Sequence, residues 1–188
     1  MNGWDETLRQ VYPLTPESVV LDLGAYHGIW SKIIWDRYRS KIYAYEPVSE
    51  FYRIATETLR GTEVCLQQVG VAAVDAVMDI RVQGDRSTLF MSGGITESVR
   101  VKAISTVMDE LPHAEVDLIK LNIEGSEYNV LESCLNNGLV KRFQNIQVQF
   151  HAFMPNAQQR RDDIRKALSA THRVTYDYPF IWENWERR

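Results

Sequence analysis

The chain has 188 residues, of which 45% are hydrophobic and 24% are charged, and its formal net charge is −4. This length suits one hydrophobic core, and the composition is typical of a globular protein rather than a disordered one. The acidic balance provides no positive field for a phosphate backbone, which disfavours nucleic acid as the main partner. We therefore expect a single domain over residues 1–188.

Two further features of the sequence narrow the class of protein. No apolar stretch approaches the ~20 residues that span a bilayer, and the N-terminal sequence MNGWDETLRQ lacks the apolar core of a signal peptide. The two cysteines, Cys65 and Cys134, are too few for a disulfide framework and lack metal-ligand spacing, so we expect buried free thiols. These features predict a cytoplasmic protein with no membrane partner and no metal site.

The first part of the chain alternates strand-length apolar runs with helix-period segments, which predicts a parallel sheet covered by helices. The run SVVLDL predicts a first strand that is buried on both faces. A helix, a strand, a second helix and a third strand follow, at GIWSKIIWDRYR, KIYAYE, residues 51–61 and TEVCLQQVGVA. In the first of these helices, we expect apolar residues from Ile29 to Tyr38 to form one inward face.

The second part of the chain begins with a segment of different character, residues 75–103. Here AVMDIRVQ and SVRVKAI alternate like strands, and we expect a hairpin-like excursion with a loop at GDRSTLFMSGG. The alternation of strands and helices then resumes. The expected elements are a short helix at Val107–Leu111, the strand EVDLIKLNI, the helix SEYNVLESCLNN ended by Gly138, the strand QNIQVQF, a helix capped by Asn156 with Gln159 at the capping-box position, and the strands HRVTYDY and FIWENW.

The stretch VVLDLGAYHG places Asp22 and two glycines where the first buried strand ends. In an open parallel sheet, ligands bind outside the carboxyl ends of the strands, and glycines let the backbone approach a ligand closely. A dinucleotide loop would have the pattern G-x-G-x-x-G, but position 26 is tyrosine. An acidic residue two positions before Gly24, with Gly28 four positions after it, suits a loop that binds S-adenosylmethionine. We expect Asp22 to help hold the ammonium group of the methionine part.

Glu46 ends the second expected strand and supplies the other half of this pattern. An acidic side chain at that position can accept hydrogen bonds from both ribose hydroxyls of a nucleoside. Carboxylates at strand ends also occur as ordinary caps and turn formers. We favour the cofactor interpretation because Asp22 and Glu46 occur in this order on consecutive strands.

These motifs resemble those of the FkbM family of S-adenosylmethionine-dependent methyltransferases, from about Val19 to His151. LDLGAYHG resembles the family's glycine loop, YAYEPVSE its acidic second strand, and VGVAAVD the stretch beside the adenine. The most specific match is VDLIKLNIEGSEYNVLE, where the family carries Lys-Ile-Asp-x-Glu-Gly-x-Glu, and VQFH resembles the end of its fifth strand. The resemblance implies a Rossmann-like class I methyltransferase fold of the α/β class, with a mostly parallel central sheet, helices on both faces and a final antiparallel strand.

The same motifs define the expected cofactor site. Residues of the glycine loop, the second strand, the stretch after the third strand and the signature would bind S-adenosyl-L-methionine: Asp22, Gly24, Ala25, Tyr26, Gly28, Glu46, Pro47, Val71, Ala72 and Asn122. Two positions depart from the family pattern, since Asn122 replaces an aspartate and Gln149 a glutamate. Both changes remove a negative charge and so disfavour a divalent metal held by carboxylates.

Methyl transfer requires an aligned acceptor and, for a hydroxyl, a base that removes its proton. Three residues at the expected ends of the fourth and fifth strands are the catalytic candidates: Asn122, Glu124 and His151. His151 can be the base or a structural histidine, and Glu124 a base, a hydroxyl-binding group or a helix cap. For Glu127 we favour a structural role, and we expect Lys120 to pair with Glu124 or another carboxylate if it is buried.

We therefore expect an S-adenosylmethionine-dependent O-methyltransferase that acts on a small-molecule or sugar/glycan hydroxyl, the sugar class being implied by the family resemblance. One alternative is a catalytically idle S-adenosylmethionine-binding regulatory protein, motivated by Asn122 and Gln149. A less favoured one is an NAD-dependent oxidoreductase, because a similar fold can host another function. The short chain leaves acceptor recognition to loops, to the terminal segment or to a second subunit, so a homo-oligomer stays open.

Overall fold

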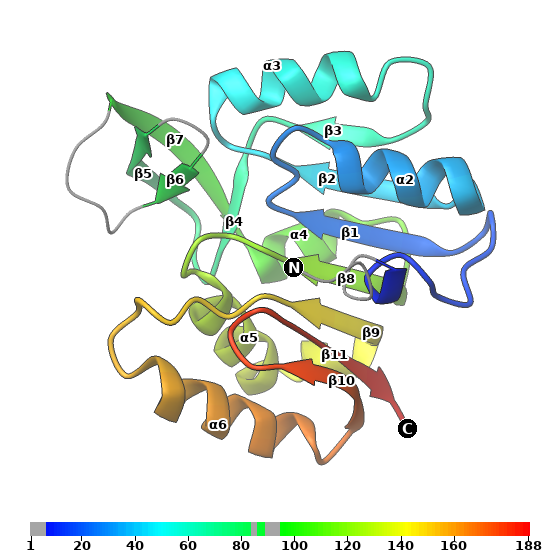
Figure 1. Cartoon of the computed structure of the whole chain (residues 1–188), viewed down its shortest axis with the longest axis vertical. Helices are drawn as coiled ribbons and strands as arrows, with labels where there is room; N and C mark the ends of the chain where they lie inside the picture. Colours follow the sequence, from blue (N-terminus) through cyan, green and yellow to red (C-terminus); the bar gives the residue numbers. More distant parts are fainter. Residues whose placement is uncertain (1–6, 84–85, 89–94) are drawn as a thin grey trace.

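A seven-stranded sheet organises the computed structural model, which describes residues 7–83, 86–88 and 95–188 (Figure 1). Its strands are β1 (Val19–Leu23), β2 (Lys41–Tyr45), β3 (Cys65–Gln67), β8 (Val116–Leu121), β9 (Phe143–Val148), β10 (His172–Tyr178) and β11 (Trp182–Arg187). Their order is β10-β11-β9-β8-β1-β2-β3. All pairs from β3 to β9 are parallel, whereas β11 runs antiparallel to both of its neighbours. The predicted mostly parallel sheet with a final antiparallel strand is confirmed.

Helices cover both faces of this sheet and create two hydrophobic cores. They are α2 (Ile29–Tyr38), α3 (Ser49–Thr58), α4 (Ile104–Glu110), α5 (Glu127–Asn136), α6 (Ala157–Leu168) and the 3-10 helix η1 (Leu139–Arg142). Because successive side chains of a strand point to opposite faces, Leu21 packs in the core with α4, α5 and α6, and Val20 in the core beneath α2. In the described ranges, no helix has the length and apolar character needed to cross a membrane.

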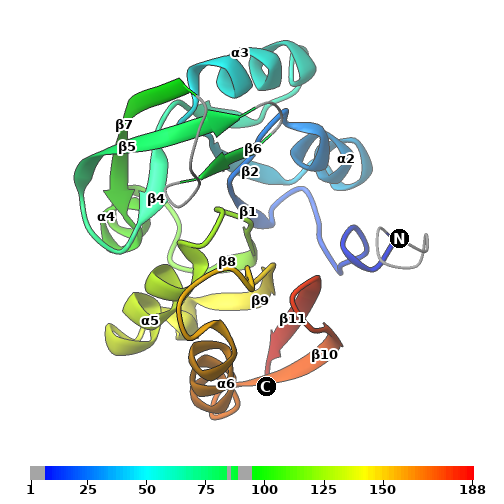
Figure 2. The same ribbon diagram turned by 60° about the vertical axis from the view of Figure 1, so that its left-hand side comes forward.

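A second sheet lies beside the first, in the order β4-β7-β5-β6 (Figure 2). Its strands are β4 (Gly70–Ala72), β5 (Ala76–Gln83), β6 (Arg86–Thr88) and β7 (Ile95–Ala103). The antiparallel pairing of β5 with β7 confirms the expected hairpin, although the expected loop between them also contains β6.

The single third strand expected at TEVCLQQVGVA is wrong, because the chain divides there between the two sheets. β3 pairs with β2 in the main sheet, and β4 pairs with β7 in the second. Gly70 allows this change of sheet, since a Cβ atom at that position would lie only 2.9 Å from Cγ1 of Val101.

Two residues that we expected to be buried, Ile29 and Cys65, are exposed to solvent. Ile29 is 59% exposed, and the buried residues of α2 are Ser31 and Ile34, so the predicted inward face is wrong at its first position. Cys65 is exposed because β3 is the edge strand of the sheet, while Cys134 is buried as predicted.

The ends of α5 and α6 illustrate one correct and one incorrect capping prediction. Gly138 follows α5 with a φ of 69°, the left-handed conformation expected of a glycine after a helix. Asn156 precedes α6 but makes no side-chain cap, and the Gln159 amide donates to Asp163 one turn later. The predicted capping box is therefore wrong.

Candidate active site

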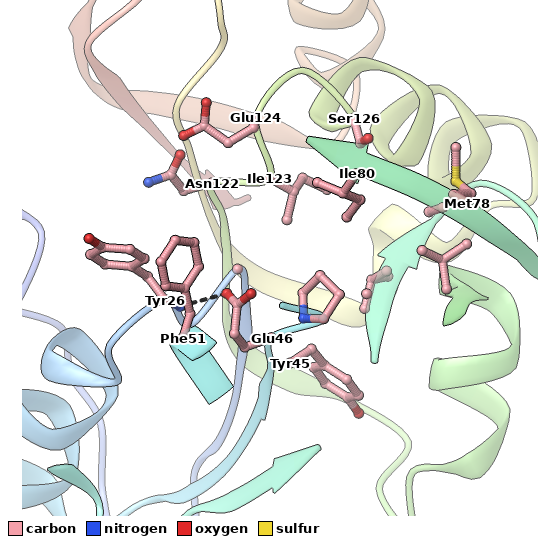
Figure 3. Close-up of a pocket in the computed structure, with 16 residues that line it drawn as sticks. Tyr26, Tyr45, Glu46, Phe51, Met78, Ile80, Asn122, Ile123, Glu124 and Ser126 are labelled. Atoms are coloured by element: carbon pink, nitrogen blue, oxygen red, sulfur yellow. Dashed lines mark hydrogen bonds between the residues drawn. The ribbon is translucent and has the colours of Figure 1, made fainter. Parts of the chain in front are cut away.

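A cavity of about 320 Å³ opens where β1, β2 and β8 end, between the main sheet and the second sheet (Figure 3). Eight of the residues singled out in the sequence line it: Gly24, Tyr26, Glu46, Pro47, Val71, Ala72, Asn122 and Glu124. The cavity lining does not include Asp22, Ala25, Gly28 or His151. The sequence therefore located half of the sixteen residues that line the cavity, and the other four predicted residues lie outside this lining.

The glycine loop depends on two left-handed glycines. Gly24 has a φ of 84°, and a Cβ atom there would lie 2.0 Å from the backbone oxygen of Asn122, so only glycine permits the ends of β1 and β8 to approach. Gly28 has a φ of 76° and a Cβ atom there would lie 3.1 Å from Cγ of Leu59. Gly24 thus shapes the cavity, whereas Gly28 allows α2 to begin against the end of α3.

Glu46 is a buried carboxylate at the centre of the cavity wall. Its Oε2 accepts the backbone N–H of Tyr26 at 2.9 Å, and its Oε1 accepts that of Val48 at 2.9 Å. Burial raises the pKa of Glu46 to about 7, although these two hydrogen bonds act in the opposite direction. Each carboxylate oxygen retains further acceptor capacity, so the group can hold the loop and also receive ligand hydroxyls.

Asp22 faces α2 instead of the cavity. It is fully buried, and its Oδ1 accepts from Nζ of Lys120 at 2.7 Å while its Oδ2 accepts from the hydroxyl of Ser31 at 2.6 Å. Nζ of Lys120 also donates to the backbone oxygen of Gly24 at 2.9 Å. The carboxylate partner of Lys120 is therefore Asp22 and not Glu124. Through the backbone oxygen of Gly24, Lys120 also holds the glycine loop on the side away from the cavity.

The second sheet contributes an apolar wall that the sequence did not assign to the site. Gly70, Met78, Ile80 and Val101 of this sheet line the cavity. The other lining residues that the sequence did not assign lie on β2, on α3 and after β8: Tyr45, Phe51, Ile123 and Ser126. The alternation of AVMDIRVQ already places Met78 and Ile80 on one face of a strand. Only the position of the second sheet against the first turns that face toward the cavity.

His151 and two carboxylates form a cluster just after β8 and β9. Nδ1 of His151 lies 3.0 Å from Oε1 of Glu127, and its Nε2 lies 3.7 Å from Oε2 of Glu124. Glu127 is fully buried and also accepts the backbone N–H groups of Ile123 and Gly125, at 2.6 and 2.8 Å. Glu127 thus has the structural role expected of it, and it is also the nearest carboxylate to the His151 ring.

The charge state of His151 follows from this cluster. Burial favours the neutral imidazole, but the carboxylates of Glu127 and Glu124 outweigh burial and raise the pKa of His151 above its ordinary value of 6.5. Since Glu124 lines the cavity, His151 is linked to the cavity through that residue.

The cavity has three chemically distinct zones, and Figure 3 shows them in sequence from one end of the cavity to the other. Met78 and Ile80 lie at an apolar end that suits a planar base, and Glu46 lies in the middle, where ribose hydroxyls could donate to it. Asn122 and Glu124 lie at the polar end.

The polar end contains an unsatisfied acceptor. The side-chain oxygen of Asn122 is shielded from solvent and has no hydrogen-bond partner among the residues that the structure describes. Leaving such a group unpaired costs about 1–3 kcal/mol, so a ligand donor would be favoured there. These zones fit S-adenosylmethionine, whereas no group of His, Cys, Asp and Glu within the described residues has the arrangement of a metal site.

Three solved structures with the same fold are methylases or hold S-adenosylhomocysteine by their descriptions. A putative rRNA-methylase from Clostridium thermocellum has a TM-score of 0.59 and 10% identity, over 99% of this chain and 96% of that one. An rRNA methylase from Streptococcus thermophilus has a TM-score of 0.56 and 9% identity, over 97% and 92%. TrmK from M. capricolum, in complex with S-adenosylhomocysteine, has a TM-score of 0.55 and 10% identity, over 100% and 69%. At these identities the likeness shows the class I methyltransferase-like fold alone.

Sequence comparison identifies the family. No curated protein matches the chain. The family model described as "Methyltransferase FkbM domain" matches residues 22–178, which include the glycine loop, Glu46, the signature around Asn122 and His151. The match disfavours the oxidoreductase alternative. The chain belongs to the FkbM methyltransferase family and is an S-adenosylmethionine-dependent methyltransferase.

Proposed function

We propose that the protein methylates a hydroxyl group of a small molecule or of a sugar or glycan, with His151 as the general base. The observation that carries this proposal is the contact of His151 with buried Glu127, beside the cavity-lining residue Glu124. A hydroxyl acceptor needs a base for its proton, and an imidazole held by a carboxylate is suited to that role.

The geometry supports a division of labour between the two ring nitrogens. Nδ1 lies 3.0 Å from Glu127, whereas Nε2 lies 3.7 Å from Glu124, so the closer carboxylate favours the proton of the neutral ring on Nδ1. Nε2 is then the nitrogen with a free electron pair for the acceptor hydroxyl's proton. When bound, S-adenosylmethionine supplies an electrophilic methyl group to the acceptor oxygen. Glu127 stabilises the imidazolium that His151 becomes.

The surroundings of this cluster favour a neutral acceptor with an apolar face. Glu124 is 35% exposed and can accept hydrogen bonds from acceptor hydroxyls. Phe153, which is 53% exposed, has its ring 5.2 Å from that of His151 and offers an apolar surface to a ring-shaped acceptor. The carboxylates and the net charge of −4 would repel a phosphate backbone, so we do not propose nucleic acid as the acceptor.

A transfer assay with methyl-labelled S-adenosylmethionine tests this function. We expect label on simple glycosides and alcohols but not on matched amines. His151→Ala should slow this transfer by about 10²–10⁴-fold while leaving the affinity for S-adenosylhomocysteine unchanged. The matched control is His113→Ala, since His113 contacts Tyr43 away from the cavity and its loss should not slow transfer.

Two outcomes of the assay would contradict the proposal. Label on amines alone would exclude hydroxyl acceptors as the favoured class. Binding of S-adenosylhomocysteine without transfer to any hydroxyl acceptor would favour the regulatory alternative.

A further inference from the structure

We infer that the side-chain oxygen of Asn122 binds the ammonium group of the methionine part of S-adenosylmethionine, the role that the sequence suggested for Asp22. The inference rests on the cofactor and not on the proposed acceptor. It can therefore fail while the proposed hydroxyl methylation stands, and the reverse also holds.

Two acceptors of the glycine loop, the Asp22 carboxylate and the Gly24 backbone oxygen, already accept hydrogen bonds. Both carboxylate oxygens of Asp22 accept hydrogen bonds, from Lys120 and from Ser31, and the residue is fully buried outside the cavity lining. The backbone oxygen of Gly24 accepts from the same Lys120 ammonium. At either residue a ligand's ammonium group would lie against the Lys120 ammonium, and two like charges at one acceptor repel each other.

Within the described part of the chain, Asn122 differs from Asp22 and Gly24 because its side-chain oxygen is an unpaired acceptor. It lines the cavity, and its side-chain oxygen is a buried acceptor without a partner among the described residues. Asn122 lies directly against the glycine loop, because a Cβ atom added to Gly24 would be only 2.0 Å from the backbone oxygen of Asn122. An ammonium group brings three donors, so it can satisfy the amide oxygen and retain donors for other groups.

The order of the zones along the cavity supports the same assignment. With a base against Met78 and Ile80 and a ribose at Glu46, the amino-acid part would extend toward Asn122 (Figure 3). Glu124 is the competing acceptor at this end. It is 35% exposed, where water weakens an ion pair, and it lies beside His151.

Calorimetric titration with two ligands tests the inference. S-adenosylhomocysteine carries the amino-acid part, and 5′-methylthioadenosine lacks it while keeping the base and ribose. We expect Asn122→Leu to weaken binding of S-adenosylhomocysteine about tenfold or more and to leave 5′-methylthioadenosine unchanged, since a hydrogen bond to a charged group is lost only with the first ligand. Asn122→Asp adds a negative charge and should strengthen S-adenosylhomocysteine relative to 5′-methylthioadenosine.

Two further variants make the result decisive. Asn136→Leu, at an exposed position of α5, should change neither affinity. Glu124→Gln tests the competing acceptor, and a selective loss of S-adenosylhomocysteine in that variant but not in Asn122→Leu would overturn the inference. An equal loss of both ligands in Asn122→Leu, with no gain in Asn122→Asp, would overturn it as well.

Discussion

The buried carboxylate of Glu46 holds the glycine loop and is also the predicted binding site of the ribose. It accepts the backbone N–H groups of Tyr26 and Val48, which holds the glycine loop against the end of β2. It also lines the middle of the cavity, where a ribose would lie under the cofactor interpretation. A buried carboxylate with a raised pKa makes the second function dependent on pH, because the ionised form is the better acceptor for two hydroxyl donors.

We predict that binding of S-adenosylhomocysteine strengthens as the pH rises through about 7, the pKa of Glu46. Below this pKa the carboxyl is mostly protonated and must lose its proton before it can accept from both ribose hydroxyls. The affinity should therefore be about tenfold higher at pH 8 than at pH 6, as calorimetry can measure. The variant Glu46→Gln should bind more weakly and lose this dependence. An affinity that stays flat or falls over this range would exclude the ribose role.

Between elements, the buried pair of Asp22 on β1 and Lys120 on β8 joins two central strands to α2. Asp22 reaches α2 through the hydroxyl of Ser31, and Lys120 reaches the glycine loop through the backbone oxygen of Gly24. Neighbouring strands place these residues opposite each other, so their side chains share one face of the sheet. A pair in this position supports the fold of the loop before any ligand arrives.

We predict that Lys120→Met destabilises the protein by about 3–5 kcal/mol, because it leaves the Asp22 carboxylate buried without its cation. Urea denaturation measures this loss. The matched control is Lys32→Met, which removes an ion pair of the same 2.7 Å length from the surface and should cost at most about 1 kcal/mol. Equal losses in the two variants would show that burial of the pair is not what makes it important.

At the scale of the whole molecule, the cavity lies between the two sheets. The glycine loop and Glu46 come from the main sheet, and Met78, Ile80 and Val101 come from the second. A ligand in this cavity contacts both sheets and is bound only by the folded chain. Binding should therefore stabilise the whole structure by mass action.

We predict that S-adenosylhomocysteine at 100 times its Kd stabilises the protein by about 2.7 kcal/mol. For a chain of 188 residues this corresponds to a Tm increase of about 5–11 °C, which thermal unfolding followed by circular dichroism measures. NAD at the same concentration is the control and should leave the Tm unchanged. A comparable increase with NAD would contradict the cofactor specificity of the loop.

Local patterns in the sequence predicted most elements of the main sheet. The uninterrupted apolar run before Asp22 predicted the buried β1 of that sheet, and the alternation in AVMDIRVQ predicted the half-exposed β5 of the second sheet. The wrong predictions concern segments whose burial or strand pairing depends on residues far away in the sequence. Cys65 is exposed because no strand of the described residues pairs with the outer edge of β3. The segment from Cys65 to Ala72 divides because its second half pairs with β7.

The sequence by itself determined the class of fold, the family and half of the cavity wall, because glycine loops, strand-end carboxylates and signature motifs are local in the chain. Tertiary structure alone decided which way the polar groups point. Asp22 faces Lys120 and Ser31, while Asn122 is left with an unpaired oxygen beside the cavity. Residue type and spacing place a carboxylate at a strand end, but whether it faces a ligand depends on side chains such as Lys120, which lies 98 positions away in the sequence.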